Sequence, residues 1–213
     1  MKLVDMLVSG FIDETASSSP APGGGSVSAL LAALSSSLGQ MVIRLTSGKK
    51  SFAELDEKVK TNLMQSLKEL EEHQKTLVSL IDEDTNAFND YMDALKLPKT
   101  NDEEKAKRKK AMSDALIVAM NIPLKTAHAS LEILKILPLI AKYGNNNAAS
   151  DVGVASLSAR AALEGAILNV KINLSGIDDK TIALEKREEC DSMLLQGESL
   201  KNEILKEIYA KIG

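Results

Sequence analysis

The chain has 213 residues, of which 44% are hydrophobic and 26% charged, so it can build a substantial core and is not expected to be disordered. Its net charge is −4 and its aromatic content only 3%, which argues against the basic surfaces and stacking rings of nucleic-acid-binding proteins. Cys190 is the single cysteine and no secretory signal pattern precedes it, so we expect no disulfide and a cytoplasmic location.

The first predicted elements are a short helix and a long uncharged helix, separated by a loop over residues 13–22. The short helix covers Met1 to Ile12, with apolar residues on one face. This second helix runs from Gly23 to about Thr46, and its uncharged part, from Gly23 to Ile43, is long enough to cross a membrane. Its many serines are a heavy polar load for lipid, so we expect a central helix buried in protein and no membrane partner.

Two longer helices follow. Ser51 and Glu54 form a capping box, which predicts a helix from there to about Lys96. Asn101 and Glu104 can cap the next helix, which continues to about Tyr143. Proline interrupts a helix where it lies in the interior, so we expect this helix to kink or divide at positions 123 and 138.

The last third of the chain predicts two more helices. One covers about Ala149 to Leu174, and Asp178 can cap another that ends near Ile212. No strand-like alternation, internal repeat or second-domain boundary is visible. The sequence therefore predicts an all-α fold, with residues 1–213 forming one domain that is a bundle of about six helices.

The segment PAPGGGS, residues 20–26, is the first candidate site. Its composition is also that of a flexible linker. It leads directly into the most apolar helix, however, and glycines at a helix start allow backbone N–H groups to approach a ligand. Both interpretations stay open for Gly23, Gly24, Gly25 and Ser26.

Asp84 is the second candidate, because it interrupts an apolar stripe. Burial of a carboxylate is unfavourable unless the group is paired or hydrogen-bonded, so its presence in the stripe suggests a function. The alternatives are that this part of the helix is exposed, or that Asp84 forms a structural ion pair. The stripe consists of Leu77, Ile81, Phe88, Tyr91 and Leu95.

Polar residues around the next helix form the third candidate. Asn145 and Asn147 lie in the loop before it, and Asp151 follows them, although Ser150 or Asp151 can also be a simple N-cap. Asn169 and Asn173 are four residues apart and share a helix face. We expect their amides to hydrogen-bond either a ligand or a partner helix.

Other functional patterns are weaker. His73 and His128 have no partners at ligand spacing, so we expect no metal site. The basic run from Lys105 to Lys110 is interpreted as a solvated helix face. No Ser-His-Asp pattern, phosphate-binding loop or dinucleotide motif is present.

Four blocks together resemble the cyclodeaminase/cyclohydrolase family. They are PAPGGGSVSALLAALSSSLGQMV, LTSGKKSF, DEDTNAFNDYMDALKLPK and YGNNNAASDVGVASLSARAALEGAILNVKINL. They occur in order over about residues 3–175, and their joint presence is more specific than any one block. The family includes the cyclodeaminase half of glutamate formiminotransferase-cyclodeaminase and stand-alone bacterial methenyltetrahydrofolate cyclohydrolases.

The resemblance implies an all-helical homodimer that binds a tetrahydrofolate derivative near its subunit interface. The enzyme would either close formiminotetrahydrofolate to methenyltetrahydrofolate with loss of ammonia, which we rank first, or open methenyltetrahydrofolate to 10-formyltetrahydrofolate. A helical folate-binding or interaction module without catalysis is the alternative of another class.

The resemblance also suggests roles for the candidate residues. Both reactions pass through a tetrahedral carbon between two nitrogens, and carboxylates can stabilise the adjoining cation and move protons. We expect Asp84 and Asp151 to do this. The Gly23–Ser26 turn and Asn145, Asn147, Asn169 and Asn173 would bind the pterin, while Lys49, Lys50 and Lys99 would attract the glutamate tail.

Overall fold

Five long helices make up most of the computed structural model, which describes residues 2–213. The long helices are α2 (Gly24–Ser47), α4 (Glu57–Lys96), α5 (Asp102–Tyr143), α6 (Ala149–Leu174) and α7 (Lys180–Ile212). The short elements are η1 (Leu3–Asp5), α1 (Val8–Thr15), the single-turn α3 (Lys50–Ala53) and η2 (Asn146–Ala148). No strand occurs in the described residues, so the all-α prediction is confirmed, with one single-turn helix more than expected.

Helix α2 is the central element, in contact with α4, α5 and α6. Small side chains along it allow these neighbours to approach closely. Two of its buried serines donate to the backbone of other helices, Ser35 to the Ala155 carbonyl at 2.7 Å and Ser36 to the Leu70 carbonyl at 2.6 Å. By length and composition α2 also qualifies as a membrane span, yet 61% of its most apolar window is buried inside the bundle.

Helices α2 and α6 run antiparallel. Gly24, at the start of α2, lies beside Asn169 near the end of α6. At the opposite end, the Asn145 N–H donates to Thr46 Oγ1 at 2.9 Å. Because α2 has 24 residues, these two ends are separated by about 35 Å.

Two of the three predicted helix caps are wrong. Ser51 lies inside α3, and α4 begins only after a turn in which Asp56 accepts from the Lys58 N–H at 2.8 Å. Asp179, one residue later than predicted, caps α7. The Asn101 cap is confirmed, because its side chain accepts from the Glu104 N–H at 2.9 Å.

Helix α5 continues through both of its prolines. The prediction that Pro123 or Pro138 divides it is therefore wrong. Pro123 is buried among neighbouring helices, and that packing offsets the hydrogen bond that each proline removes.

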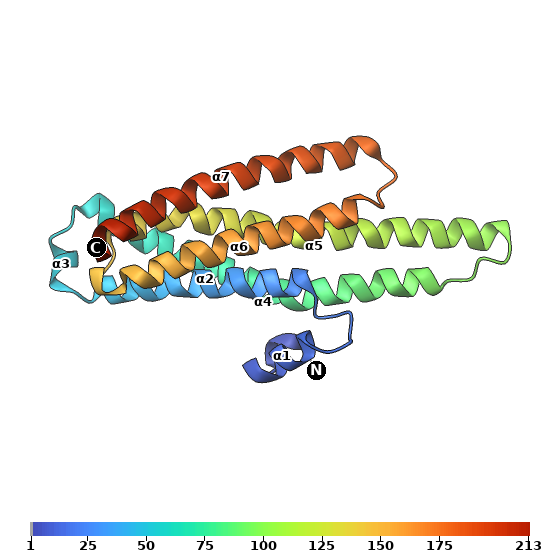
Figure 1. Cartoon of the computed structure of the whole chain (residues 1–213), viewed down its shortest axis with the longest axis horizontal. Helices are drawn as coiled ribbons and strands as arrows, with labels where there is room; N and C mark the ends of the chain where they lie inside the picture. Colours follow the sequence, from blue (N-terminus) through green and yellow to red (C-terminus); the bar gives the residue numbers. More distant parts are fainter. Residues whose placement is uncertain (1) are drawn as a thin grey trace.

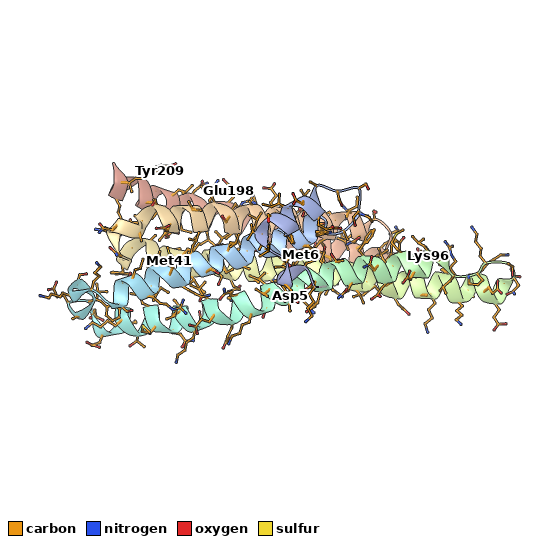
Figure 2. All side chains as sticks on the ribbon, turned by 90° about the horizontal axis from the view of Figure 1, so that it is seen from below. Asp5, Met6, Met41, Lys96, Glu198 and Tyr209 are labelled. Carbon is orange, nitrogen blue, oxygen red and sulfur yellow. The ribbon has the colours of Figure 1, made fainter. Side chains whose placement is uncertain are left out.

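The α4–α5 pair extends beyond the rest of the bundle as a two-helix hairpin, and α1 stands outside the bundle (Figure 1). Lys96 lies towards the far end of this hairpin (Figure 2). The expected helix over residues 1–12 is only partly correct, since η1 precedes α1, which begins at Val8, and Met1 lies outside the described residues. The Leu3 N–H donates to Asp82 Oδ1 at 2.6 Å and ties this segment to α4.

The cap of α4 gives a direct test of the corrected boundary. Asp56→Ala removes the side chain that accepts from the first turn, so we expect the free energy of unfolding to fall by about 1 kcal/mol. Ser51→Ala is the matched control and should change it by less than about 0.5 kcal/mol. Urea unfolding followed by circular dichroism measures both, and a larger loss for Ser51→Ala would contradict the observed boundary.

Candidate active site

The Asp84 carboxylate on α4 lies against the first turn of α2. Its Oδ2 accepts from the Ser26 N–H at 2.9 Å, and the Ser26 hydroxyl is 3.2 Å from the same oxygen. The Ser26 hydroxyl is also 2.7 Å from the Ile81 carbonyl, one turn earlier on α4. N–H groups in a first helical turn have no partner within the helix and carry partial positive charge, so this position stabilises an anion.

The glycines before Ser26 are required by this close approach. A Cβ on Gly25 would overlap the Asp84 carboxylate, and a Cβ on Gly24 would lie 3.0 Å from the Asn169 amide nitrogen. Gly25 and Ser26 are buried in the first turn of α2. The segment is therefore a helix start fitted to a carboxylate, and the flexible-linker interpretation is wrong.

The pKa of Asp84 is raised above its ordinary value, mainly because burial disfavours the charged form. The hydrogen bonds from the Ser26 side chain and backbone act in the opposite direction and lower the pKa, but by less. No ion pair to Asp84 occurs among residues 2–213. A half-buried carboxyl group whose pKa lies above its ordinary value holds its proton more firmly than an exposed one, which suits a group that must both take up and release a proton.

A cavity of about 320 Å³ opens in front of Asp84. This volume is within the range of small-molecule sites. Its wall consists of the glycine turn, several polar side chains, and apolar side chains from α4, α5 and α6. The lining residues are Pro20, Ala21, Gly23, Gly24, Asp84, Thr85, Phe88, Tyr91, Ala119, Asn169, Ile172 and Asn173.

The two asparagines of α6 line this cavity, and each amide nitrogen donates one of its two hydrogens to a backbone carbonyl. Asn169 Nδ2 donates to the Gly165 carbonyl at 2.8 Å, and Asn173 Nδ2 donates to the Ala119 carbonyl on α5 at 2.8 Å. These bonds fix the orientation of both amides. Each residue keeps its amide oxygen as an acceptor and its second amide hydrogen as a donor, so the acceptors can take N–H donors of a ligand.

Lys99 lies in the loop between α4 and α5 and lines a hollow that shares Tyr91 with the cavity. The remaining predicted residues, Lys49, Lys50, Asn145, Asn147 and Asp151, lie at the opposite end of the bundle. Asp151 is in the first turn of α6, about 27 Å from Asn169 along the helix. Asn145 and Lys49 line a separate hollow there of about 310 Å³. One chain therefore does not bring Asp84 and Asp151 into one site.

Local contacts define the roles of the Asn-rich turn. The Asn145 side chain accepts from the Asn147 N–H at 3.1 Å and caps η2, after which Ala148 occupies the N-cap position of α6. The alternative that Ser150 or Asp151 is simply the N-cap is wrong, because both lie inside α6. Asn147 is exposed and Asp151 half-buried.

Several cavity residues escaped the sequence analysis. Phe88 and Tyr91 were assigned to the apolar core stripe of α4, but both are half-buried and line the cavity beside Asp84. Thr85 follows Asp84 directly, and its hydroxyl is 3.2 Å from that of Ser26. The signal for these three residues was their spacing of one to seven positions from Asp84 on the same helix.

A metal site is not formed by the described part of the chain. Among residues 2–213, no group of three or more histidine, cysteine, aspartate or glutamate side chains is arranged to hold an ion. The chemistry that the cavity offers comes from one carboxyl group, the start of α2 and the two amide oxygens.

The raised pKa of Asp84 predicts how stability depends on pH. Between the unfolded value of 3.8 and the higher folded value, the folded protein binds more protons, so this group makes stability fall as pH rises. Asp84→Asn keeps the acceptor for Ser26 and removes the charge. We expect the difference in unfolding free energy, variant minus parent, to become more positive as pH rises through that window.

Urea unfolding at a series of pH values measures this difference. Glu103→Gln, on the exposed first turn of α5, is the control and should give a difference that is flat near pH 4 to 7. A loss of stability in Asp84→Asn that is the same at every pH would instead mean a purely structural hydrogen-bonding role.

Comparison with known proteins gives a consistent result over nearly the whole chain. The chain is 38% identical to a methenyltetrahydrofolate cyclohydrolase of Methylorubrum extorquens, over 95% of this chain and 96% of that protein. It is 32% identical to the formimidoyltransferase-cyclodeaminase of Mus musculus, over 98% of this chain but only 38% of that longer protein.

Fold comparison agrees with the sequence relationship. The crystal structure of a formiminotetrahydrofolate cyclodeaminase from Thermotoga maritima superposes with a TM-score of 0.85 and 27% identity, covering 98% of each chain. The family model described as formiminotransferase-cyclodeaminase matches residues 7–192. The predicted resemblance is confirmed, and this chain belongs to the formiminotransferase-cyclodeaminase family.

Proposed function

We propose that this protein is a folate one-carbon enzyme that converts formiminotetrahydrofolate to 5,10-methenyltetrahydrofolate and releases ammonia. The observation that carries the proposal is the half-buried Asp84 carboxyl group, which faces a cavity of about 320 Å³ and is held by the glycine-rich start of α2. Relatives named as enzymes support it against the alternative of a non-catalytic interaction module.

Asp84 can serve each proton transfer of this reaction. N10 of the folate attacks the carbon of the protonated, amidinium-form formimino group, and the carboxylate accepts the proton that N10 loses. The same group then gives that proton to the amino nitrogen of the tetrahedral carbon, so that ammonia departs and the methenyl cation remains. A positioned acid–base group contributes about 10²–10⁴-fold to the rate, and the ionised carboxylate also stabilises the cationic product.

The remaining cavity groups suit the pterin. Its ring N–H and amino groups are donors, and the free amide oxygens of Asn169 and Asn173 are acceptors at fixed positions. Gly23 and Gly24 leave room for a flat ring beside the first turn of α2, whose N–H groups are donors for the pterin carbonyl. Phe88 and Tyr91 offer aromatic surface for stacking.

The second candidate is methenyltetrahydrofolate cyclohydrolase, and a specific comparison favours it. The full-length relative at 38% identity carries that name. In this reaction Asp84 takes a proton from water as the water attacks the methenyl carbon. Asp84 then gives that proton to N5 as the bond between N5 and the carbon breaks, and the carbon-bound hydroxyl loses its own proton to solvent as the formyl C=O forms. The two reactions share the carbon centre, so the same residues serve either.

Parallel assays separate the two reactions and test the role of Asp84. Ammonia release from formiminotetrahydrofolate and loss of methenyltetrahydrofolate absorbance are measured with the same protein. We expect ammonia release, and Asp84→Asn should lower kcat by roughly 10²-fold or more. Glu103→Gln should leave it unchanged.

The outcomes are distinct. Hydrolysis without ammonia release assigns the cyclohydrolase reaction. Folate binding without turnover in either assay contradicts the enzymatic proposal. Unchanged turnover in a folded Asp84→Asn protein removes Asp84 from the chemistry.

We also propose that the protein is a homodimer whose subunits share their sites. The outward sides of α2 and α6 carry an apolar stripe with helical spacing. An exposed apolar surface of this length is typical of a protein–protein interface. The exposed residues are Leu34, Met41 and Leu45 on α2, and Val154, Leu157, Leu168 and Ile172 on α6. Met41 is labelled in Figure 2.

The position of this stripe favours a second copy as its occupant. Ile172 belongs both to the stripe and to the cavity wall, so the cavity lies at the edge of the apolar face. A two-fold axis perpendicular to α2, passing between the two copies at the level of the helix midpoint, would bring the partner's α2 C-terminal end to this chain's α2 N-terminal end. Lys49, Asn145, Asn147 and Asp151 of one subunit would then approach Asp84 of the other, which accounts for their separation within one chain.

Mixing variants tests this sharing. Asp84→Asn and Asp151→Asn should each lose roughly 10²-fold or more in turnover alone. After subunit exchange, half of the dimers are mixed and each mixed dimer has one intact site, so an equal mixture should regain about a quarter of the parent activity.

The matched control mixes Asp84→Asn with Asn169→Ala, which affect the same cavity wall of the same chain. No mixed dimer then has an intact site, so activity should stay low. Absence of recovery in the first mixture, or sedimentation as a monomer at micromolar concentration, would contradict the shared site.

The cytoplasmic location expected from the lone cysteine, Cys190, stays a prediction.

A further inference from the structure

Thr85 does not make the hydrogen bond that a threonine in a helix usually makes. Such a threonine donates to the carbonyl three or four residues earlier, as Thr46 and Thr61 do at 2.6 and 2.8 Å. Thr85 is half-buried in α4 and lines the cavity. In the described part of the chain its hydroxyl has one partner, the hydroxyl of Ser26 on α2 at 3.2 Å. This contact therefore joins two helices instead of closing one turn.

The carbonyl that Thr85 would ordinarily reach is that of Ile81, four residues earlier. Ser26 occupies this position, because its buried hydroxyl lies 2.7 Å from the Ile81 oxygen. The same hydroxyl lies 3.2 Å from Asp84 Oδ2. Ser26 Oγ thus has three oxygen neighbours from α4, and it has a single hydrogen to donate to them.

The hydrogens of the two hydroxyls can be assigned from these contacts. A backbone carbonyl and an ionised carboxylate are acceptors only, so neither Ile81 nor ionised Asp84 can donate to Ser26. Thr85 can, and Ser26 Oγ accepts the Thr85 hydrogen while it gives its own hydrogen to one of the other two oxygens. Since the Ile81 carbonyl also accepts a backbone N–H within α4, it keeps a partner when the Ser26 hydrogen turns away.

The direction of the Ser26 hydrogen follows the charge of Asp84. An ionised carboxylate is a stronger acceptor than a neutral carbonyl, so the hydrogen then points to Oδ2. When Asp84 takes up a proton, Oδ2 becomes a neutral acceptor and the shorter contact with the Ile81 carbonyl is favoured. Oδ1 accepts from no donor among residues 2–213, so it is the oxygen left to exchange a proton with a ligand.

Thr85 strengthens the bond from Ser26 to the carboxylate without a hydrogen bond of its own to that group. A hydroxyl that accepts a hydrogen bond becomes a better donor, because the accepted bond polarises its O–H. Ser26 is fully buried, so water cannot take the place of the Thr85 donor. Loss of the Thr85 hydroxyl should therefore weaken the support for ionised Asp84.

In the described residues, the cavity wall holds no charged side chain besides this carboxylate. Asp82 and Glu83 precede it on α4, but they accept from the Leu3 N–H and the Ser79 hydroxyl. The wall contains one further titratable group, Tyr91 of α4, and the lining residues from α2, α5 and α6 are uncharged. Side-chain support for the ionised form therefore comes from the two hydroxyls.

We propose that Thr85 is a positioning residue for proton transfer by Asp84, because its hydroxyl donates to Ser26 and keeps the Ser26 hydroxyl directed at the ionised carboxylate. This inference rests on the proposed function, in which Asp84 carries the proton. Thr85 acts through Ser26, so its removal should change how readily Asp84 loses a proton.

The first experiment measures the pKa of Asp84 without any folate. It is read from the pH dependence of the side-chain carboxyl ¹³C resonance, which is assigned by its loss in Asp84→Asn. Thr85→Val keeps the shape of the side chain and removes the hydroxyl, so the pKa of Asp84 should rise by about 0.5, roughly threefold in proton affinity. Thr85→Ser keeps the hydroxyl and should restore the parent value.

Thr61→Val is the matched control. It is the same substitution on the same helix, but Thr61 is exposed and donates within α4, so the pKa of Asp84 should not change. If Thr85→Val does not fold, Thr85→Ala removes the same hydroxyl and carries the same expectation. A parent-like pKa of Asp84 in the folded variant would overturn the proposal.

The second experiment measures kcat/KM against pH with the proposed substrate. On the acid side of the profile, Asp84 must be ionised to accept a proton, so this side should move to higher pH in Thr85→Val by the same amount as the pKa. Thr85→Ser should return it to the parent position. A raised KM with neither the pKa nor the profile changed would make Thr85 a substrate-binding residue and overturn the positioning role.

The outcomes separate this inference from the proposed function. A raised pKa of Asp84 in a Thr85→Val protein, with no folate turnover by the parent, would keep the Thr85 assignment and contradict the proposed reaction. Turnover with the parent pKa and pH profile in Thr85→Val would overturn the Thr85 assignment alone. A destabilised Thr85→Val protein with an unchanged pKa of Asp84 would reduce the hydroxyl pair to a structural link between α2 and α4.

Discussion

The contact between the Asp84 carboxylate and the first turn of α2 is the constraint on which the rest of the site depends. Two positions in the first turn of α2 must carry no side chain. A Cβ on Gly25 would occupy the position of the carboxylate, and a Cβ on Gly24 would lie 3.0 Å from the Asn169 amide nitrogen. Ser26 must supply both its N–H and its hydroxyl. These requirements explain why the most apolar helix of the chain begins with three glycines and a serine rather than with an ordinary capping residue.

The central position of α2 follows from the same arrangement. If α2 is to present its first turn to α4, it must pack closely on both α4 and α6, and small residues make that possible. Gly165 on α6 faces Ser28, and a Cβ there would overlap the serine hydroxyl. The uncharged sequence that resembles a membrane span is thus the consequence of burial between helices, with serines that bond to neighbouring carbonyls.

Much of the fold could be predicted from the sequence, because long helices with three-to-four spacing depend on local signals. The helix boundaries were harder to predict. Ser51 and Glu54 have the spacing of a capping box, but the chain makes a turn at Leu55 and Asp56 is the residue that caps α4. The continuity of α5 through Pro123 depends on packing against other helices, which the sequence of α5 alone does not reveal.

The candidate site divides in the same way. Asp84 and the glycine segment could be found because each breaks a local pattern: a charge in an apolar stripe, and glycines before an apolar helix. Their contact, which joins α2 and α4, could not be predicted. The distance between Asp151 and the cavity could not be predicted either. Asp151 and Asn169 belong to one block of sequence, but they lie near opposite ends of a 26-residue helix. Phe88 and Tyr91 were misassigned because core and cavity wall have the same periodicity.

The charges around the two hollows give the site a direction. The substrate and product proposed here carry an amidinium-like cation at one end and carboxylates at the other. Asp84, beside the cavity, would attract the cation. A basic hollow where the α4–α5 hairpin leaves the bundle, lined by Lys105, Arg108 and Lys109, would attract the carboxylates and repel the cation. A reversed ligand would bring like charges together at both positions. The acidic cavity and the basic hollow would therefore favour one orientation of the proposed substrate. In that orientation the reacting carbon would lie next to Asp84, the only carboxyl group of the cavity wall in the described residues.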